Sequence, residues 1–288
     1  MDVAKVYDKV SEAYSEFYNN DIYSIEEDRL IAQLLMSRMP TAPDGAIRIA
    51  DLGCGAGWPR VIWDEISASH ALHYDGCDIS DGMIEQANEA YAPEMTAGHA
   101  AFRQADIRTA LSNVPASSYD LVVSLHGVFS HLRHEELPPI MAEIQRILRP
   151  GGTCVLGFYS RFADCRAPEH PRVLDHECRQ LGTAVDDATV TSITYTADEV
   201  RQLFAEAGMT VDTIQGFGVE GGDPDIHGKL VERQNALDAR DEQGGGRAVR
   251  EAQRALRNEA REIVEADAQL GRKNPERAHE IMAFARRK

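Results

Sequence analysis

The stretch IRIADLGCGAG, residues 47–57, decides the fold of this chain. Its first half is a short run of β-branched and apolar residues, as in a buried strand, and its second half contains Gly53, Gly55 and Gly57. Glycines there allow unusual backbone angles and let a ligand approach the main chain without an intervening Cβ. A helix that follows would add free N–H groups at the same place. The stretch predicts a strand–turn–helix unit with a bound ligand, and an ordinary tight turn is the alternative.

Strand-like and helix-like segments alternate on the C-terminal side of this unit. The expected strands are 73–80, 100–107, 119–127 and 153–160, and the helices between them are 61–70, 81–92 and 137–152. Such alternation predicts right-handed βαβ crossovers and a doubly wound, mostly parallel α/β sheet. Ligands bind at the carboxyl ends of the strands in such sheets, so the residues just after each strand are the candidates for a site.

The rest of the chain is divided around this core. Residues 1–44 are predicted to form an N-terminal helical lid, because apolar residues recur there every three or four positions. Residues 45–220 are the predicted ligand-binding core, and residues 221–288 are a helical insertion and a closing strand of the same domain. Within the core, 160–190 is expected to be loop with short helix, and Asp81 is a plausible N-cap. Thr196 and Glu199 match a capping box.

Composition restricts the classes of function. The net charge is -17, from 30 Lys and Arg against 47 Asp and Glu, which disfavours a nucleic-acid substrate and anionic membranes. No apolar run approaches the ~20 residues that span a bilayer, and the N-terminus lacks a signal peptide, so a cytoplasmic location is expected. The five cysteines contain no CxxC pair, so a disulfide framework is not expected.

The spacing of the glycines narrows the type of ligand. The dinucleotide fingerprint is G-x-G-x-x-G, whereas this loop has G-x-G-x-G with Trp58 next, so an NAD-dependent oxidoreductase is disfavoured. The loop resembles the first motif of class I S-adenosylmethionine-dependent methyltransferases. That resemblance implies that Asp51 orders the loop and the methionine amino group. It also implies that the cofactor's methionine and ribose pack on the backbone of this loop, including Gly53, Cys54, Gly55 and Gly57.

Other landmarks of the methyltransferase family follow in order. The resemblance places Asp78 on the ribose hydroxyls, and a carboxylate can accept two hydrogen bonds from a cis-diol. It places Ile79 and Met83 on the adenine ring, Asp106 on the adenine amino group, and Ile107 beside the ring. Leu125, at the end of the fourth strand, completes this part of the cofactor set, and the turn Arg149-Pro150-Gly151-Gly152 is a structural landmark. The resemblance covers about residues 45–215 and implies a Rossmann-like, seven-stranded sheet that binds S-adenosylmethionine.

The acceptor side of the pocket is expected after the fourth strand. Methyl transfer needs mainly a dry site and an in-line nucleophile, and a base only where the nucleophile arrives protonated. His126 and His131 are the candidate catalytic bases, because imidazole titrates near neutrality. The alternative is that one packs on the cofactor and the other caps a helix. Arg161, Arg166 or Arg172 would bind an acidic substrate group, or are solvated.

Two further patterns are open to both a functional and a structural interpretation. Tyr7, Tyr14 and Tyr18 share a helix face, which is a core stripe or a lid over the cofactor, and Tyr14 is the preferred candidate for cofactor contact. Cys165, His170, His176 and Cys178 lie close in sequence, but their spacing fits no common zinc pattern, so no metal is predicted.

The function predicted from the sequence is methyl transfer from S-adenosylmethionine to an N or O atom of a small molecule. Two alternatives stay open: a methyltransferase that acts on protein or RNA, and a non-catalytic module that binds the cofactor or a partner. No nucleic-acid or membrane partner is expected. The segment 221–275 is expected to cover the active site or to form a homodimer contact, or else to be a solvated helical pair.

Overall fold

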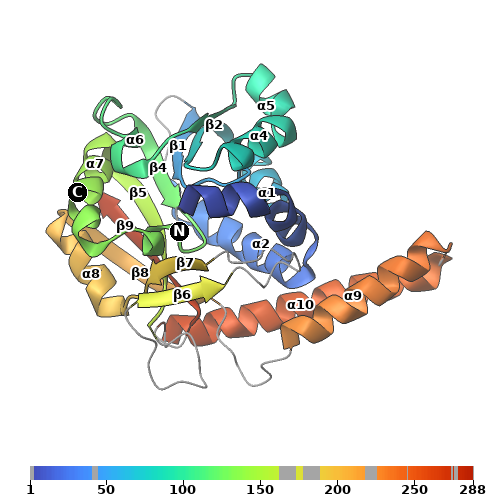
Figure 1. The fold of residues 1–288 in the computed structure, drawn as a ribbon. Helices are drawn as coiled ribbons and strands as arrows, with labels where there is room; N and C mark the ends of the chain where they lie inside the picture. The colour runs from blue at the N-terminus through green and yellow to red at the C-terminus, as the bar shows by residue number, and fades with distance from the viewer. Residues whose placement is uncertain are drawn as a thin grey trace.

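The computed structural model describes residues 3–40, 45–161, 173–177, 189–217, 226–244, 246–273, 275 and 278–287. Its centre is a seven-stranded sheet with the order β3-β2-β1-β4-β5-β9-β8 (Figure 1). The strands β1 to β5 are parallel, and β9 runs antiparallel between β5 and β8. Their bounds are β1 Ala46–Leu52, β2 Ala71–Asp78, β3 Ala100–Gln104, β4 Tyr119–Ser124, β5 Leu148–Tyr159, β8 Met209–Phe217 and β9 Glu280–Arg287. This is the predicted doubly wound, mostly parallel α/β fold.

Helices cover both faces of the sheet, and the core is correspondingly divided in two. On β4, Val122 belongs to one apolar cluster, with α7 and α8, while Leu121 and Val123 belong to the other, with α2 and α3. Successive residues of a strand point to opposite faces, so the three consecutive apolar residues Leu121–Val123 require cover on both faces of the sheet. The helices within this layered core are α3 Arg60–Ser67, α4 Asp81–Ala90, α5 Ala92–Thr96, α6 Ile107–Ala110, α7 Leu137–Ile147 and α8 Ala197–Glu206.

Helix ends follow their capping chemistry. The capping box of α8 is present, with Thr196 and Glu199 bonding each other's backbone N–H. The prediction of Asp81 as the N-cap of α4 is wrong: Ser80 is the cap, accepting from the Met83 N–H at 3.1 Å, and Asp81 lies in the first turn. The fifth strand also begins earlier than expected, because α7 ends at Ile147 and β5 includes the glycine turn.

Helix α1 Val3–Asn20 and a small second sheet lie near the carboxyl ends of the parallel strands, whereas α2 Ile22–Met36 packs with α3 on one face of the main sheet (Figure 1). The prediction of loop with short helix for 160–190 is wrong in its described parts: β6 Val173–Glu177 and β7 Thr189–Ile193 pair antiparallel as a two-stranded sheet. The two strands are defined by backbone hydrogen bonds to each other, which the sequence of either segment alone did not reveal. Two 3-10 turns, η1 Val128–His131 and η2 His134–Glu136, follow β4.

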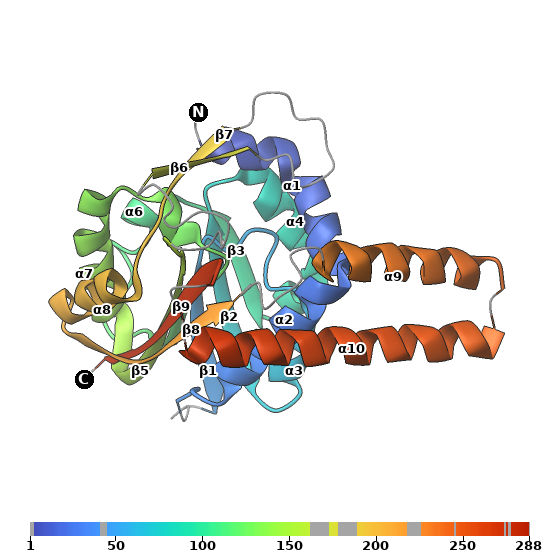
Figure 2. The same ribbon diagram turned by 90° about the horizontal axis from the view of Figure 1, so that it is seen from below.

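The predicted helical insertion is a hairpin that projects from the body of the molecule (Figure 2). It consists of α9 Ile226–Glu242 and α10 Gly246–Lys273. Leu256, Ala260, Val264 and Ala268 recur every fourth position along α10 and are buried, which places one face of the helix against α2 and β8. Among the described helices, none combines the length and apolarity needed to cross a membrane.

Candidate active site

One cavity of about 790 Å³ lies at the carboxyl ends of the central strands, where sequence reasoning placed the site. It brings together the predicted cofactor and base residues: Asp51, Gly53, Cys54, Gly55, Gly57, Asp78, Ile79, Met83, Asp106, Ile107, Leu125, His126 and His131. Tyr14 lies in α1, and its side chain is outside the described residues. Tyr7 of the same helix lines the cavity, and so does Val3.

The glycine loop after β1 has the backbone that only glycine adopts readily. Gly53, Gly55 and Gly57 have φ of +75°, +53° and +89°. A Cβ on Gly57 would lie 2.7 Å from the ring of Tyr91, so packing also requires glycine there. A Cβ on Gly55 would meet only the Met83 sulfur, at 3.9 Å. The loop is therefore open toward the cavity at Gly55, which leaves its main chain accessible to a ligand.

Asp51, at the end of β1, is a buried carboxylate with spare hydrogen-bonding capacity. It is 2% exposed, and its Oδ2 accepts the Tyr74 hydroxyl at 2.6 Å. Its Oδ1 has no hydrogen-bond partner among the described residues. Burial raises the pKa of Asp51 to about 7, against the effect of the Tyr74 hydrogen bond. A buried acceptor without a partner is costly, so this oxygen fits a cationic donor such as an ammonium group.

Asp78, at the end of β2, connects the two loops that border the cavity. Its Oδ2 accepts from the Gly55 N–H and its Oδ1 from the Ser80 N–H, both at 2.9 Å. Burial raises the pKa of Asp78, while these backbone donors favour its charged form. Helix α1 reaches the same place: Asp8 Oδ1 accepts the Ser80 hydroxyl at 2.6 Å and the Gly82 N–H at 3.3 Å.

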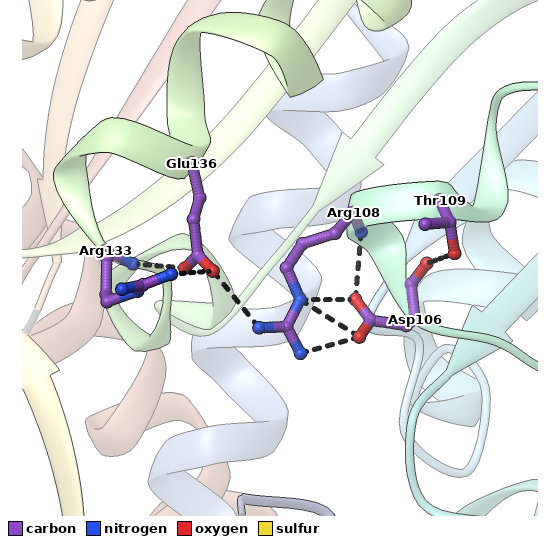
Figure 3. A network of polar contacts seen from close by, with 5 residues as sticks. All are labelled: Asp106, Arg108, Thr109, Arg133 and Glu136. Atoms are coloured by element: carbon purple, nitrogen blue, oxygen red, sulfur yellow. Dashed lines mark hydrogen bonds and ion pairs between the residues drawn. The ribbon is translucent and has the colours of Figure 1, made fainter.

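Asp106 is already engaged by a residue that sequence reasoning missed (Figure 3). Both oxygens of Asp106 accept from the Arg108 guanidinium, at 2.6 to 2.9 Å, and Arg108 also donates to Glu136 at 3.1 Å. The hydrogen bond from Arg108 lowers the pKa of Asp106. Arg108 lines the cavity, so it ties the loop after β3 to η2 across the rim. The only sequence signal was an arginine two residues after the predicted aspartate.

His126 lies just after β4 in a left-handed conformation, with φ of +55°. Its Nε2 is 3.5 Å from Oδ1 of Asp28, a residue of α2 that is 1% exposed. Burial lowers the pKa of His126, but the hydrogen bond and charge of Asp28 and the charges of Glu280 and Glu27 outweigh it and raise this pKa to about 9. The imidazole is therefore protonated at neutral pH, which does not suit a general base there.

His131 lies between two hydroxyl groups. Its Nε2 is 3.2 Å from the Tyr7 hydroxyl and its Nδ1 is 3.1 Å from Ser192 Oγ on β7. Its ring also makes edge contacts with Tyr7 and Tyr159. These contacts join α1, η1 and β7 above the cavity. Of the three tyrosines of the helical stripe, Tyr7 is the one whose side chain is described, and it lies at the site.

The arginines considered for substrate binding differ in what the structure says of them. Arg161 pairs with Glu199 at 2.6 Å, at the start of α8. Arg166 and Arg172 lie outside the described residues, as do Cys165, His170 and Cys178 of the cysteine- and histidine-containing segment, and so does the His176 side chain.

Comparison with known proteins identifies a conserved unit in this core. Residues 49–152 match the methyltransferase domain family. A trans-aconitate 2-methyltransferase from Streptomyces avermitilis is 33% identical over 184 residues, which cover 62% of this chain and 63% of the relative. One from Streptomyces coelicolor is 36% identical over 137 residues, which cover 47% of this chain and 41% of the relative. The chain thus spans less than two thirds of either relative.

Solved structures share the fold at low sequence identity. Phosphoethanolamine N-methyltransferase 2 from Haemonchus contortus, in complex with phosphomonomethylethanolamine and S-adenosylhomocysteine, aligns with a TM-score of 0.58 and 15% identity, over 100% of this chain and 61% of that one. A methyltransferase from Haloferax volcanii, in complex with the Trm112 activator, aligns with a TM-score of 0.56 and 16% identity, over 99% and 97%. The chain therefore carries a methyltransferase domain at residues 49–152, within a fold that it shares with solved methyltransferases.

Proposed function

We propose that this chain transfers a methyl group from S-adenosylmethionine to an O or N atom of a small molecule. The observation that carries the proposal is the buried Asp51, whose Oδ1 has no partner among the described residues, next to a left-handed glycine loop in the main cavity. That combination fits a nucleoside that carries an amino-acid side arm, with the ammonium at Asp51 and the ribose packed on the loop backbone.

Each of the neighbouring residues has a binding role that follows from its chemistry. Asp51 would accept from the ammonium of the cofactor, and Asp78 from its ribose hydroxyls with the lone pairs that its backbone donors leave. Ile79, Met83 and Ile107 supply apolar surface for adenine. When bound, S-adenosylmethionine supplies a methyl group that its sulfonium already activates. The remaining task of the protein is to exclude water and to orient the acceptor.

The state of the two histidines limits the type of acceptor. His126 is protonated at neutral pH, and both ring nitrogens of His131 lie at hydrogen-bond distance from hydroxyl groups. An acceptor that arrives as a carboxylate or as an uncharged amine needs no base. The two Streptomyces relatives are named for trans-aconitate, an acid, which supports a carboxylate oxygen as the acceptor to test before amines.

Two experiments on the full chain test the proposal in sequence. Calorimetry with S-adenosylmethionine, S-adenosylhomocysteine and NAD should give heat of binding with the first two only. Asp51→Asn should weaken the binding of both. A screen of small carboxylic acids, amines, RNA and peptides for release of S-adenosylhomocysteine then identifies the acceptor class. Binding without release in any screen would favour the non-catalytic alternative, and no binding at all would refute the proposal.

The role of the α9–α10 hairpin is a separate part of the proposal. None of its described residues lines the cavity, so of the roles considered for it a homodimer contact is the one we retain. Asp238 and Gln253 lie side by side, with a hydrogen bond of 2.9 Å, so replacing residues 239–252 by a short glycine linker shortens the hairpin and keeps its base. Light scattering on that variant should show a monomer where the wild type is a dimer. We also propose a cytoplasmic location for this chain.

A further inference from the structure

Two cavity-lining groups of opposite charge lie close together where β1 and β4 end. One is Asp51, and the other is His126. β1 and β4 are neighbouring parallel strands in which Asp51 pairs with Val123, so His126, three residues beyond Val123, lies at the same end of the sheet as Asp51. The charge of His126 opposes the rise in the pKa of Asp51. The cavity wall therefore presents an anion and a cation next to each other, both largely removed from water.

The position of His126 is fixed from behind by two carboxylates. Asp28 Oδ1 lies 3.5 Å from its Nε2, and Glu280 accepts from the Gly127 N–H at 3.2 Å. His126 and Gly127 both have positive φ, +55° and +69°, so Glu280 holds the backbone of a left-handed turn. Asp28 is on α2 and Glu280 on β9, and neither belongs to the matched stretch 49–152.

The same carboxylates set the charge of His126. They raise its pKa to about 9 in spite of burial, and Glu27 contributes in the same direction at the pH where it is ionised. Burial raises the pKa of Glu27 itself to about 8, with the charges of Glu280 and Asp28 adding to it, so at neutral pH Glu27 is largely uncharged. His126 is thus an imidazolium between a carboxylate-lined interior and the cavity.

We propose that His126 binds the α-carboxylate of the cofactor's amino-acid end, while Asp51 binds its α-ammonium, and that Asp28 positions His126. The inference rests on the proposed function. An α-amino acid carries its two charges on one carbon, so it needs an anionic and a cationic partner side by side, and these two residues are such a pair. The assignment makes His126 a binding residue for the cofactor in place of a base for the acceptor.

The test compares two ligands that differ only in the carboxylate. S-adenosylhomocysteine carries it, and decarboxylated S-adenosylhomocysteine keeps the ammonium but lacks it. Calorimetry is run on the wild type and on His126→Asn, because asparagine tolerates the left-handed conformation at this position. The variant should bind S-adenosylhomocysteine about 10- to 100-fold more weakly, the range for a lost charged hydrogen bond, and the decarboxylated ligand within about threefold of wild type.

The outcomes separate this inference from the proposed function. Equal losses for both ligands, or no loss for either, would overturn the role of His126 while the cofactor site stands. Failure of the wild type to bind either ligand would refute the proposed function itself. Unfolding midpoints of wild type and variant show whether the protein is folded in each titration.

The positioning role of Asp28 has its own readout, the pH dependence of discrimination between the two ligands. The wild type should prefer the carboxylated ligand up to about pH 9 and lose this preference above it. Asp28→Asn removes the group that contributes most to the raised pKa of His126, so the loss should begin at lower pH, and Asp28→Glu should restore part of the difference. The amine titrates in both ligands, and Glu27 titrates in the wild type and in both variants, so these groups affect each side of the comparison alike. An unchanged profile in Asp28→Asn would refute the positioning role.

Discussion

Substitution of Gly55 by valine should abolish cofactor binding while the protein still folds. Gly55 has φ of +53°, and a Cβ there meets only the Met83 sulfur at 3.9 Å. The folding cost is therefore mainly the left-handed backbone, about 2 kcal/mol for a non-glycine residue. In a domain of this size that lowers Tm by about 4 to 8 °C. The new side chain would occupy the open side of the loop, where a ligand must pack.

Gly98 supplies the matched control. Its φ is +75°, a Cβ there meets nothing within 4 Å, and it does not line the cavity. Gly98→Val should lose a similar free energy of unfolding, measured by chemical denaturation, and should keep wild-type affinity for S-adenosylhomocysteine by calorimetry. The reasoning about the loop is refuted if Gly55→Val binds normally, or if Gly98→Val loses binding to the same extent.

Three other predictions concern charged groups. The affinity for S-adenosylhomocysteine should fall by up to tenfold per unit below about pH 7, because Asp51, with its pKa raised to about 7, then loses the charge that attracts an ammonium; calorimetry giving a flat profile from pH 5.5 to 7.5 would contradict this. Asp120→Ala should cost about 3 kcal/mol of unfolding free energy in denaturant titrations, because this buried carboxylate accepts from Arg48 N and Arg149 at 2.9 Å each. Arg108→Ala should change stability by less than about 1 kcal/mol, since Arg108 is 46% exposed, and should not weaken the cofactor; a tenfold loss in calorimetry would make Arg108 a cofactor ligand.

Local patterns were sufficient for the fold and for one side of the site. The centre of strand β4, Leu121–Val123, is apolar and is buried on both faces, and the glycines after β1 adopt the left-handed angles that their spacing predicted. Asp51, Asp78 and Asp106 each lie at or just after the carboxyl end of a parallel strand, so the topology alone brings them to one cavity. Their roles as ligand-binding groups stay predictions.

Long-range contacts could not be predicted in the same way. The sequence of α2 does not show that Asp28 is buried, and only the position of α2 beside the end of β4 makes Asp28 the partner of His126. Glu280 reaches the same turn from β9, whose position between β5 and β8 depends on pairing across the whole chain. Arg108 could have been noticed two residues after Asp106, but its second contact, with Glu136, comes from another loop. The strands β6 and β7 were not predicted. β6 is short and ends in three polar residues, whereas the β-branched residues of β7 were a strand signal that could have been used.

The contact of Asp8 with Ser80 and Gly82 has a thermodynamic consequence. Ser80 donates its N–H to Asp78 and its hydroxyl to Asp8. The docking of α1 and the binding of a ribose at Asp78 therefore involve the same turn after β2. Coupling between two such events is reciprocal: whatever factor an added nucleoside contributes to the docked population of α1, docked α1 returns to the affinity for that nucleoside. A protease that cleaves within residues 3–12 should therefore be slowed by saturating ligand, and Asp8→Ala should reduce both that protection and the affinity.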